Sequence, residues 1–534
     1  MESVDYVIVG AGSSGCVLAN KLSEDGRCSV LLLESGGPNT SHLIRMPRGI
    51  GALLVPTNPN VWSYQVAPLP GRPEELWLKG RTIGGSSSVN GMVYVRGAPA
   101  DYDAWEQSGC SGWGWRDIGP CFAALEDHEL PPKSSRGRGG PLRITVHPTQ
   151  HPLCDAVIAA AEQAGTPHVE DINDLAAVAS GGFGYQPRTV WRGKRFSAAD
   201  AFLAPARRRP NLSVVTNTDA LRVEFNGRRA TGVRVRDRTG ERTITARHEV
   251  ILCAGAIHSP KILQLSGIGP AGTLQGAGVN VLVDSSEVGR NLREHRYLAV
   301  QFRVTGGSLN GRFAGLGLAR SMARYLLSST GPLSHAAHEA GGFIKSRPDL
   351  DRPDGQIGVG LYSMQLSGQK VAIDPEPGLT IGGYWMRPQS RGELWIRSAD
   401  PEAAPYINPN TFASQIDRQS SISVFRWIRR LATQPALAGY IERELTPGPA
   451  VQSDEEILEA YLKLGNTAYH ICGTCRMGSD DQSVVDPQLK VRGVEGLRVI
   501  DTSIMPTLVS GNTNAPAMAI ALRAAQIMAQ SGRP

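Results

Sequence analysis

The sequence predicts an α/β (α+β) fold in which a Rossmann-like nucleotide-binding domain is combined with an antiparallel sheet. A strand, glycine loop, helix and second strand at the N-terminus predict the first part. Stretches of alternating apolar and polar residues, divided by turn residues, predict antiparallel strands in the middle of the chain. The length of 534 residues, 41% of them hydrophobic, is sufficient for two or more structural units.

The N-terminal pattern has all the parts of a βαβ unit. Residues 6–9 (YVIV) are a short β-rich apolar run, typical of a buried parallel strand. The glycine motif at 10–15 (GAGSSG) and apolar residues at helical spacing follow, and a second apolar run at 30–33 (VLLL) ends on Glu34. This order predicts a dinucleotide site at the end of the first strand.

Each position of the motif suits a dinucleotide for a physical reason. Gly10 permits the tight turn, Gly12 lets the backbone approach a pyrophosphate, and Gly15 lets helix and strand pack closely. The helix N-terminus offers free N–H groups to the phosphates. Glu34, nineteen residues after Gly15, is placed to accept from ribose hydroxyls, which disfavours NADP. The motif alone does not separate FAD from NAD.

Two later regions have clear secondary-structure signals. Residues 221–235 and 242–252 alternate like antiparallel strands around the turn pairs Asn226-Gly227 and Thr239-Gly240. Near the C-terminus, Pro516 suits the first turn of a helix whose apolar residues continue to Ile527. We therefore expect hairpins in the middle of the chain and a helix at its end.

Composition excludes several classes of partner. The net charge of +6 is small for this length and Lys and Arg are scattered, so nucleic-acid binding is not indicated. No apolar run reaches the roughly 18 residues of a spanning helix, so we expect no transmembrane segment. Eight cysteines without a repeating frame, and no visible signal peptide, favour a reduced, cytoplasmic setting. The sequence does not indicate the oligomeric state.

Three further segments carry distinctive residues. Residues 80–90 (GRTIGGSSSVN) form a donor-rich glycine and serine loop that can lie flat against a planar ligand. Residues 255–269 (GAIHSPKILQLSGIG) follow a predicted strand at 250–254. Residues 469–478 (YHICGTCRMG) pair with a second motif at 511–516 (GNTNAP).

With these motifs, in this order, the sequence resembles the glucose–methanol–choline (GMC) oxidoreductase family over about residues 5–529. In general character it is most similar to the bacterial choline-dehydrogenase-like and sorbose-dehydrogenase-like enzymes. The resemblance implies an FAD-binding domain with an interleaved antiparallel-sheet domain for the substrate. The implied limits are 1–155, 210–300 and 465–534 for the FAD domain, and 156–209 and 301–464 for the substrate domain.

The resemblance implies FAD-dependent oxidation of an alcohol, primary and either aryl or aliphatic, to the aldehyde or ketone. His470 matches the catalytic histidine, which would take the hydroxyl proton while the hydride goes to flavin N5. Asn514 matches the second catalytic position, where an amide can hold the alcohol oxygen. Oxygen or another electron acceptor would reoxidise the flavin, so oxidase and dehydrogenase both stay open. Histidines outside this context are interpreted as structural: His258, His295, His335 and His338.

The resemblance also assigns cofactor contacts and pocket residues. The expected FAD contacts are Gly10, Gly12, Ser13, Ser14, Gly15, Glu34, Trp62, Arg81, Gly84, Gly85, Ser86, Asn90, Gly91, Met92, Val93, Val223, Ala254, Tyr469, Asp501, Thr502, Asn512, Thr513 and Asn514. Val89 stands where some family members carry a histidine bonded to the flavin, so we expect noncovalent FAD. Candidate pocket residues are Tyr362, Met364, Tyr384, Trp385 and Tyr469.

Two alternative functions stay open. One branch of the family binds FAD but cleaves hydroxynitriles without net redox chemistry, and a dinucleotide-binding module without catalysis is a second alternative. Cys472 and Cys475 could be a redox pair or, with His470, part of a zinc site. No second half-site with comparable spacing is present, so we interpret them as packing residues and predict no metal site.

Overall fold

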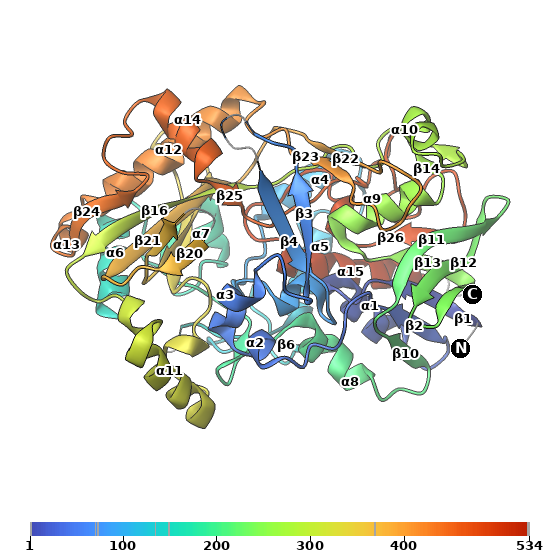
Figure 1. Cartoon of the computed structure of the whole chain (residues 1–534), viewed down its shortest axis with the longest axis horizontal. Coiled ribbons are helices and arrows are strands. Elements are labelled where there is room, and N and C mark those ends of the chain that lie inside the picture. The colour runs from blue at the N-terminus through green and yellow to red at the C-terminus, as the bar shows by residue number, and fades with distance from the viewer. Residues whose placement is uncertain are drawn as a thin grey trace.

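The computed structural model describes residues 3–69, 71, 74–133, 135–147, 150–367 and 370–530. Two seven-stranded sheets lie in opposite halves of the molecule, with the hairpin of β3 (Val61–Val66) and β4 (Glu75–Gly80) between them (Figure 1). The predicted mixed α/β fold is confirmed.

The first sheet contains the predicted nucleotide-binding unit. Its strand order is β10-β2-β1-β13-β12-β11, with β26 paired to β13. Strands β10, β2, β1, β13 and β26 run parallel, whereas β11 and β12 form antiparallel hairpins with β13. The bounds are β1 (Ser3–Val9), β2 (Val30–Leu33), β10 (Leu212–Val215), β11 (Asp219–Asn226), β12 (Arg229–Asp237), β13 (Gly240–Leu252) and β26 (Leu497–Val499). The predicted strands and both predicted turns are therefore confirmed.

Two helices complete this half. Helix α1 (Ser13–Leu22) connects β1 to β2, and α15 (Asn514–Gln530) packs against α1 and against α5 (Trp115–Leu125). Most side chains of α15 are buried, because it lies within the core. The expected C-terminal helix is confirmed, and it begins at Asn514, two residues before Pro516.

The second sheet is antiparallel throughout. Its order is β24-β16-β21-β18-β17-β7, with β25 paired to β16. The bounds are β7 (Gly182–Tyr185), β16 (Arg296–Val304), β17 (Ala340–Ile344), β18 (Gly355–Gly360), β21 (Gly378–Trp385), β24 (Ile441–Thr446) and β25 (Asn466–Thr467). Helices α6 (Pro152–Gln163), α12 (Gln415–Ala432) and α14 (Asp454–Lys463) pack on it. Each sheet has its own hydrophobic core, so the two halves are separately packed units.

Shorter elements connect these layers. The helices are α2 (His42–Arg45), η1 (Pro47–Gly49), α3 (Ile50–Leu53), η2 (Gly85–Ser88), α4 (Pro99–Gln107), α7 (Leu175–Ser180), the π-helix η3 (Ala199–Leu203), α8 (Ala204–Ala206), α9 (Gly255–Leu265), α10 (Ala271–Gly276), η4 (Asn310–Arg312), α11 (Gly315–Ser328), η5 (Pro332–Ser334), α13 (Pro435–Ala438) and η6 (Thr502–Ile504). The remaining strands are β5 (Glu126–His128), β6 (Leu142–Ile144), β8 (Val190–Trp191), β9 (Lys194–Arg195), β14 (Ile268–Gly269), β15 (Val283–Asp284), β19 (Met364–Ser367), β20 (Lys370–Ile373), β22 (Glu393–Trp395) and β23 (Tyr406–Asn408).

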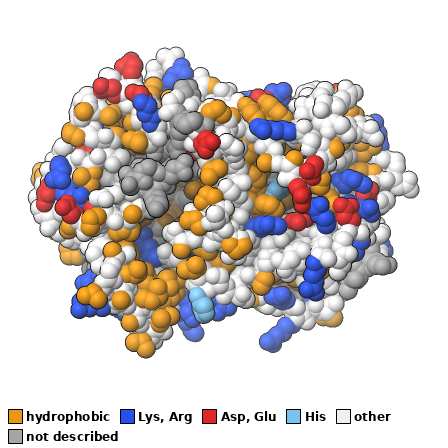
Figure 2. Space-filling model, viewed as in Figure 1, with side chains coloured by type: hydrophobic (Ala, Val, Ile, Leu, Met, Phe, Trp, Pro, Cys, Tyr) orange, Lys and Arg blue, Asp and Glu red, His pale blue; other side chains and the backbone are white. Residues whose placement is uncertain are grey.

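The surface has one apolar region that stands out in the views. Helix α11 projects from the lower left of the molecule in Figure 1, and orange side chains gather at the same edge in Figure 2. Across the described residues, no helix combines the length and the apolar character needed to cross a membrane.

Candidate active site

A cavity of about 700 Å³ lies where the two halves meet, within the range of ligand sites. One end of its wall comes from the first sheet, including Gly10, Gly12 and Glu34. The other end includes Tyr384 from the second sheet, together with His470. A ligand that fills the cavity therefore contacts both halves.

The glycine loop is shaped as the motif predicts. Gly10 has a φ of +102°, and a Cβ there would lie 2.6 Å from the carbonyl oxygen of Cys253. A Cβ on Gly15 would clash with the Gly10 carbonyl oxygen, because helix α1 crosses the strand end closely. A Cβ on Gly12 would reach only the Cys253 oxygen, at 3.9 Å, so the space beyond Gly12 belongs to the cavity.

The N-terminus of α1 is open to an anionic group. Gly12 is the cap residue, no side chain bonds to the cap, and the first turn contains no acid. Ser13 and Ser14 line the cavity. The free N–H groups of this turn thus match the phosphates of a dinucleotide.

Glu34 directly follows β2, and backbone donors fix its carboxylate. Ala11 N–H donates to Oε2 at 3.0 Å, and Gly36 N–H donates to Oε1 at 2.8 Å. Burial raises the pKa of Glu34 to about 7. Each carboxylate oxygen keeps a second lone pair, so Glu34 can still accept from ribose hydroxyls.

Most of the other predicted FAD contacts line the same cavity. They are Trp62, Arg81, Gly85, Ser86, Asn90, Gly91, Met92, Val93, Ala254, Tyr469, Asp501, Thr502, Asn512, Thr513 and Asn514. Gly15 and Gly84 shape the loops: Gly84 has a φ of +88°, and a Cβ on its neighbour Gly85 would lie 2.7 Å from Gly12 Cα. Val223 is buried in the first core, and Leu221, two residues earlier on β11, lines the cavity instead.

At the end of the cavity near the second sheet, His470 is hydrogen-bonded to a second histidine. His470 Nδ1 lies 2.9 Å from Nδ1 of His295, and His295 Nε2 lies 2.8 Å from the carbonyl oxygen of Met386. The pairing of Arg296 on β16 with Thr467 on β25 brings the two histidines together. The sequence analysis assigned His295 no functional role, since no local motif marks it.

The hydrogen bonds fix the tautomer of His470. The Met386 carbonyl only accepts, so His295 carries its proton on Nε2 and offers a bare Nδ1. His470 must then donate from Nδ1, which leaves its Nε2 unprotonated. His470 Nε2 is therefore available as a base.

A second chain of hydrogen bonds leads to the same nitrogen. The Tyr384 hydroxyl donates to Gln356 Oε1 at 2.5 Å, and Gln356 Nε2 donates to Asn512 Oδ1 at 2.9 Å. Asn512 Nδ2 lies 2.9 Å from His470 Nε2. The Tyr384 ring also stacks on His295, with 4.4 Å between centroids. Both sets of hydrogen bonds, through His295 and through Asn512, leave Nε2 of His470 as an acceptor.

Asn514 lies elsewhere than the sequence analysis expected. Its Oδ1 accepts from the Ser13 hydroxyl at 2.7 Å, at the glycine loop. Asn514 is the first residue of α15, and successive side chains on a helix start point in different directions. The amide beside His470 belongs to Asn512, which the sequence analysis had placed only among the cofactor contacts.

Glu294 holds the backbone of both histidines. Its Oε1 accepts from the N–H groups of His295 and His470, each at 2.8 Å, and its Oε2 accepts from the Thr467 hydroxyl at 2.6 Å. This support stabilises Tyr469, whose φ of +65° is unfavourable for a non-glycine residue. Burial, followed by the nearby His295 and the Lys79 ammonium, holds the pKa of His470 well below its usual range. His470 is thus neutral at physiological pH.

The candidate pocket residues divide into two groups. Tyr384 and Tyr469 line the cavity. Trp385 donates its indole N–H to Asp417 at 3.2 Å, and Tyr362 packs under the Arg48 guanidinium. Met364 begins β19, and its side chain is exposed.

Cys472 and Cys475 are buried, free thiols in the first hydrophobic core. Burial raises the pKa of both thiols, which makes the reactive thiolate form unfavourable. This environment agrees with their interpretation as packing residues.

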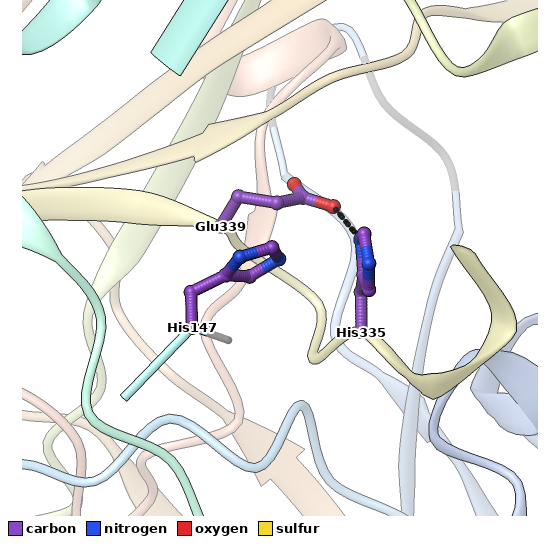
Figure 3. Close-up of side chains that lie close together, drawn as sticks. All are labelled: His147, His335 and Glu339. Atoms are coloured by element: carbon purple, nitrogen blue, oxygen red, sulfur yellow. Dashed lines mark hydrogen bonds and ion pairs between the residues drawn. The ribbon is translucent and has the colours of Figure 1, made fainter. Parts of the chain in front are cut away.

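A separate cluster brings together His147, His335 and Glu339 (Figure 3). Their potential metal-binding atoms lie within 4.8 Å of one another. However, the Glu339 carboxylate is already paired with the Arg48 guanidinium and accepts from His335 Nδ1 at 3.3 Å. The ion pair with Arg48 neutralises the only anionic group, so we assign this cluster a structural role.

Family models and full-length relatives match this chain. Models of GMC oxidoreductases match residues 4–297 and 388–521. An alcohol dehydrogenase [acceptor] of Pseudomonas putida is 39% identical over 532 residues, covering 98% of this chain and 95% of the relative. The mitochondrial choline dehydrogenase of Mus musculus is 40% identical over 541 residues, covering 99% of this chain and 89% of the relative.

The similarity extends to a solved structure. The crystal structure of pyridoxine 4-oxidase from Mesorbium loti matches with a TM-score of 0.88 and 31% sequence identity, covering 99% of this chain and 100% of that one. The family models and the full-length relatives agree with the resemblance of the sequence motifs. The chain therefore belongs to the GMC oxidoreductase family, whose activity is the FAD-dependent oxidation of alcohols.

Proposed function

We propose that this chain oxidises a neutral alcohol, using His470 as the base and noncovalently bound FAD as the hydride acceptor. The observation that carries the proposal is the unprotonated Nε2 of His470, which faces the cavity beside the Asn512 amide. Both groups lie in one cavity with the glycine loop and Glu34. Cofactor and substrate would therefore meet in one site.

The chain's own residues suit FAD. The open space at Gly12 and the uncapped helix α1 would hold the pyrophosphate, and Glu34 would hold the ribose. Helix α15 presents its N-terminus to the cavity through Thr513 and Asn514, which favours negative charge there. Val89 has no nucleophilic atom, so we propose that FAD is held without a covalent bond.

Proton removal falls to His470. The hydroxyl proton would pass to His470 Nε2, and the resulting imidazolium would keep donating from Nδ1 to His295. Its low pKa, caused by burial, keeps His470 unprotonated before the reaction. Bound FAD supplies the acceptor for the hydride.

We assign the orienting amide to Asn512. Gln356 occupies Asn512 Oδ1, so the NH₂ group faces His470 and can donate to the alcohol oxygen beside Nε2. Asn514, bonded to Ser13, would act on the geometry of the glycine loop and of FAD.

The two asparagines should separate experimentally. Asn512→Ala is expected to slow flavin reduction about 10-fold or more, because it removes one hydrogen bond to the reacting oxygen. Asn514→Ala is expected to lower FAD affinity while changing the reduction rate of FAD-loaded enzyme by less. FAD titration and anaerobic stopped-flow on both variants measure this. The reverse pattern would restore the catalytic assignment to Asn514.

The substrate end of the cavity favours an uncharged alcohol. It is lined by aromatic and neutral polar side chains, namely Gln186, Tyr297, His338, Gln356, Tyr384 and Tyr469, and by one cation, Lys79, whose ammonium donates to the Tyr469 carbonyl. A quaternary ammonium group would be expected to have a carboxylate beside its aromatic cage. We therefore propose a primary aryl or aliphatic alcohol in preference to choline.

A panel of alcohols tests the proposed function. Purified holoenzyme is mixed anaerobically with an aryl alcohol, an aliphatic alcohol or choline. Its oxidised flavin absorption band should disappear fastest with a neutral primary alcohol. Acid precipitation of the same sample should leave FAD in the supernatant. If only choline reduced the flavin, the proposed substrate class would be wrong. If the flavin stayed in the protein pellet, FAD would be covalently bound. If no alcohol reduced the flavin, a lyase would be favoured. Oxygen and an artificial acceptor, compared afterwards, separate oxidase from dehydrogenase.

We propose the domain division 1–155, 210–300 and 465–534 against 156–209 and 301–464, supported for most of the chain by the two hydrophobic cores. The cores depart from these limits at residues 198–206, which pack in the first core, and at Leu153, Cys154, Leu298 and Val300, which pack in the second. We also propose a reduced, cytoplasmic setting, supported by eight free, buried cysteines.

A further inference from the structure

Helix α11 presents apolar side chains outward, the reverse of an ordinary surface helix. Leu316, Leu326 and Leu327 are 78%, 73% and 89% exposed, whereas Ser321 and Tyr325 are the buried residues of this helix. At 100° per residue, Leu316 and Leu327 lie on the face opposite Ser321 and Tyr325, and Leu326 lies on the flank of the helix. Water therefore meets the apolar face of α11.

Helix α11 packs against a short apolar segment at residues 42–55. Tyr325 packs in one cluster with Met46 and Leu333, which joins α11 to the α2–η1 region and to η5. Leu43 and Val55, near the two ends of the segment 42–55, are also exposed. We call α11 together with residues 42–55 the basal patch. In Figure 2 orange and blue side chains occupy this edge of the molecule.

The charge of the basal patch has one sign. The sequence contains no Asp or Glu from residue 35 to 73 or from residue 304 to 338. One arginine of the patch, Arg48, has a buried side chain that pairs with Glu339. The four exposed arginines of the patch and its rim make no salt bridge within the described ranges: Arg45, Arg312, Arg320 and Arg324. Elsewhere on the surface, arginines are commonly paired with acids, as Arg242 is with Asp237.

We propose that the basal patch binds the surface of an anionic lipid bilayer, with α11 lying in the interface and its leucines among the acyl chains. Exposed leucines beside unpaired arginines match a surface that is apolar below and negatively charged at the headgroups. A second copy of the chain is a poorer occupant. A two-fold contact through this patch would place arginines near arginines, with no acid of the patch to pair with them.

The basal patch is firmly attached to the rest of the protein. Arg48 pairs with the buried Glu339, and its guanidinium stacks on Phe313 and Tyr362 at 5.4 and 5.0 Å. In the same region, Ile50 and Leu54 form part of the cavity wall. A bilayer bound to the patch would therefore lie beside the FAD and substrate cavity.

Vesicle flotation of the holoenzyme tests the proposal. Wild type should float with phosphatidylcholine vesicles that contain phosphatidylglycerol, and less with pure phosphatidylcholine or at high salt. The variant L316S/L326S/L327S should lower the partition coefficient at least about tenfold, because three apolar side chains no longer insert. The variant R320A/R324A should lower it about tenfold on anionic vesicles only.

Matched variants elsewhere serve as controls. L175S/V281S/I416S removes three exposed apolar side chains away from the patch, and R207A/R208A removes two exposed arginines. Both should float like wild type. All variants should reduce their flavin with a water-soluble alcohol at the wild-type rate, so a failure of the proposed chemistry is distinguished from a failure of membrane binding.

Three outcomes would overturn the proposal. Wild type could fail to float with anionic vesicles, or the patch leucine variant could float as well as wild type. Light scattering could also show a wild-type dimer that the leucine variant converts to a monomer, without flotation. That result would assign the basal patch to a second copy of the chain.

Discussion

His470→Ala is expected to slow flavin reduction by the alcohol about 10²–10⁴-fold, the usual loss when a positioned base is removed. Without the base, expulsion of hydride from a neutral alcohol would leave a protonated carbonyl. Anaerobic stopped-flow isolates this half-reaction from the oxidant. FAD content and thermal stability should stay close to wild type, because the side chain of His470 lies at the substrate end of the cavity.

The control for this experiment is His470→Gln, which keeps a polar side chain in the buried position. Both variants should be slow, since neither has a nitrogen base at Nε2. If either retains FAD and is reduced within a few-fold of the wild-type rate, His470 is not the base. If both lose FAD before they lose rate, its role is structural.

His295→Ala is expected to slow the same step about 10–10²-fold, although His295 itself is not placed to contact the alcohol. In serine proteases, the residue that fixes the tautomer of the catalytic histidine is worth about 10⁴-fold. His295 is neutral, because burial lowers its pKa to about 3, so it orients His470 but adds no charge to stabilise the imidazolium. A smaller loss is therefore expected.

His295→Asn distinguishes positioning from packing. An asparagine amide oxygen can take the place of Nδ1 and accept from His470, but it leaves the Met386 carbonyl without its donor. The asparagine variant should recover much of the rate that the alanine variant loses, at similar thermal stability. Equal rates for the two variants would show that His295 only fills space.

The basal patch shares Ile50 and Leu54 with the cavity wall but no residue with the catalytic contacts at His470. None of the four leucines of α11 lines the described cavity, and the hydrogen bonds at His470 involve no residue of the patch. Membrane binding would therefore change where the enzyme acts without changing flavin reduction by a soluble alcohol.

The nucleotide-binding half was readable from the sequence because its signals are local. Gly10, Gly12 and Gly15 act on neighbouring backbone, and Glu34 directly follows the next strand, so short-range sterics dictate their arrangement. The hairpins of β11, β12 and β13 follow in the same way from alternation and turn residues. Beyond this half, the family motif at residues 469–478 also allowed the role of His470 to be predicted from the sequence.

Only the tertiary structure decided how the catalytic end is arranged. His295 and His470 are 175 positions apart, and the register of β16 against β25 joins them, which no local pattern specifies. Within the run Asn512-Thr513-Asn514, composition could not tell which amide faces the base. The start of α15 turns Asn514 toward Ser13, and Gln356 from the other sheet fixes Asn512 against His470. The sequence by itself thus determined the fold and the cofactor loop. Side-chain direction and long-range strand register, which depend on the packed whole, determined the catalytic contacts.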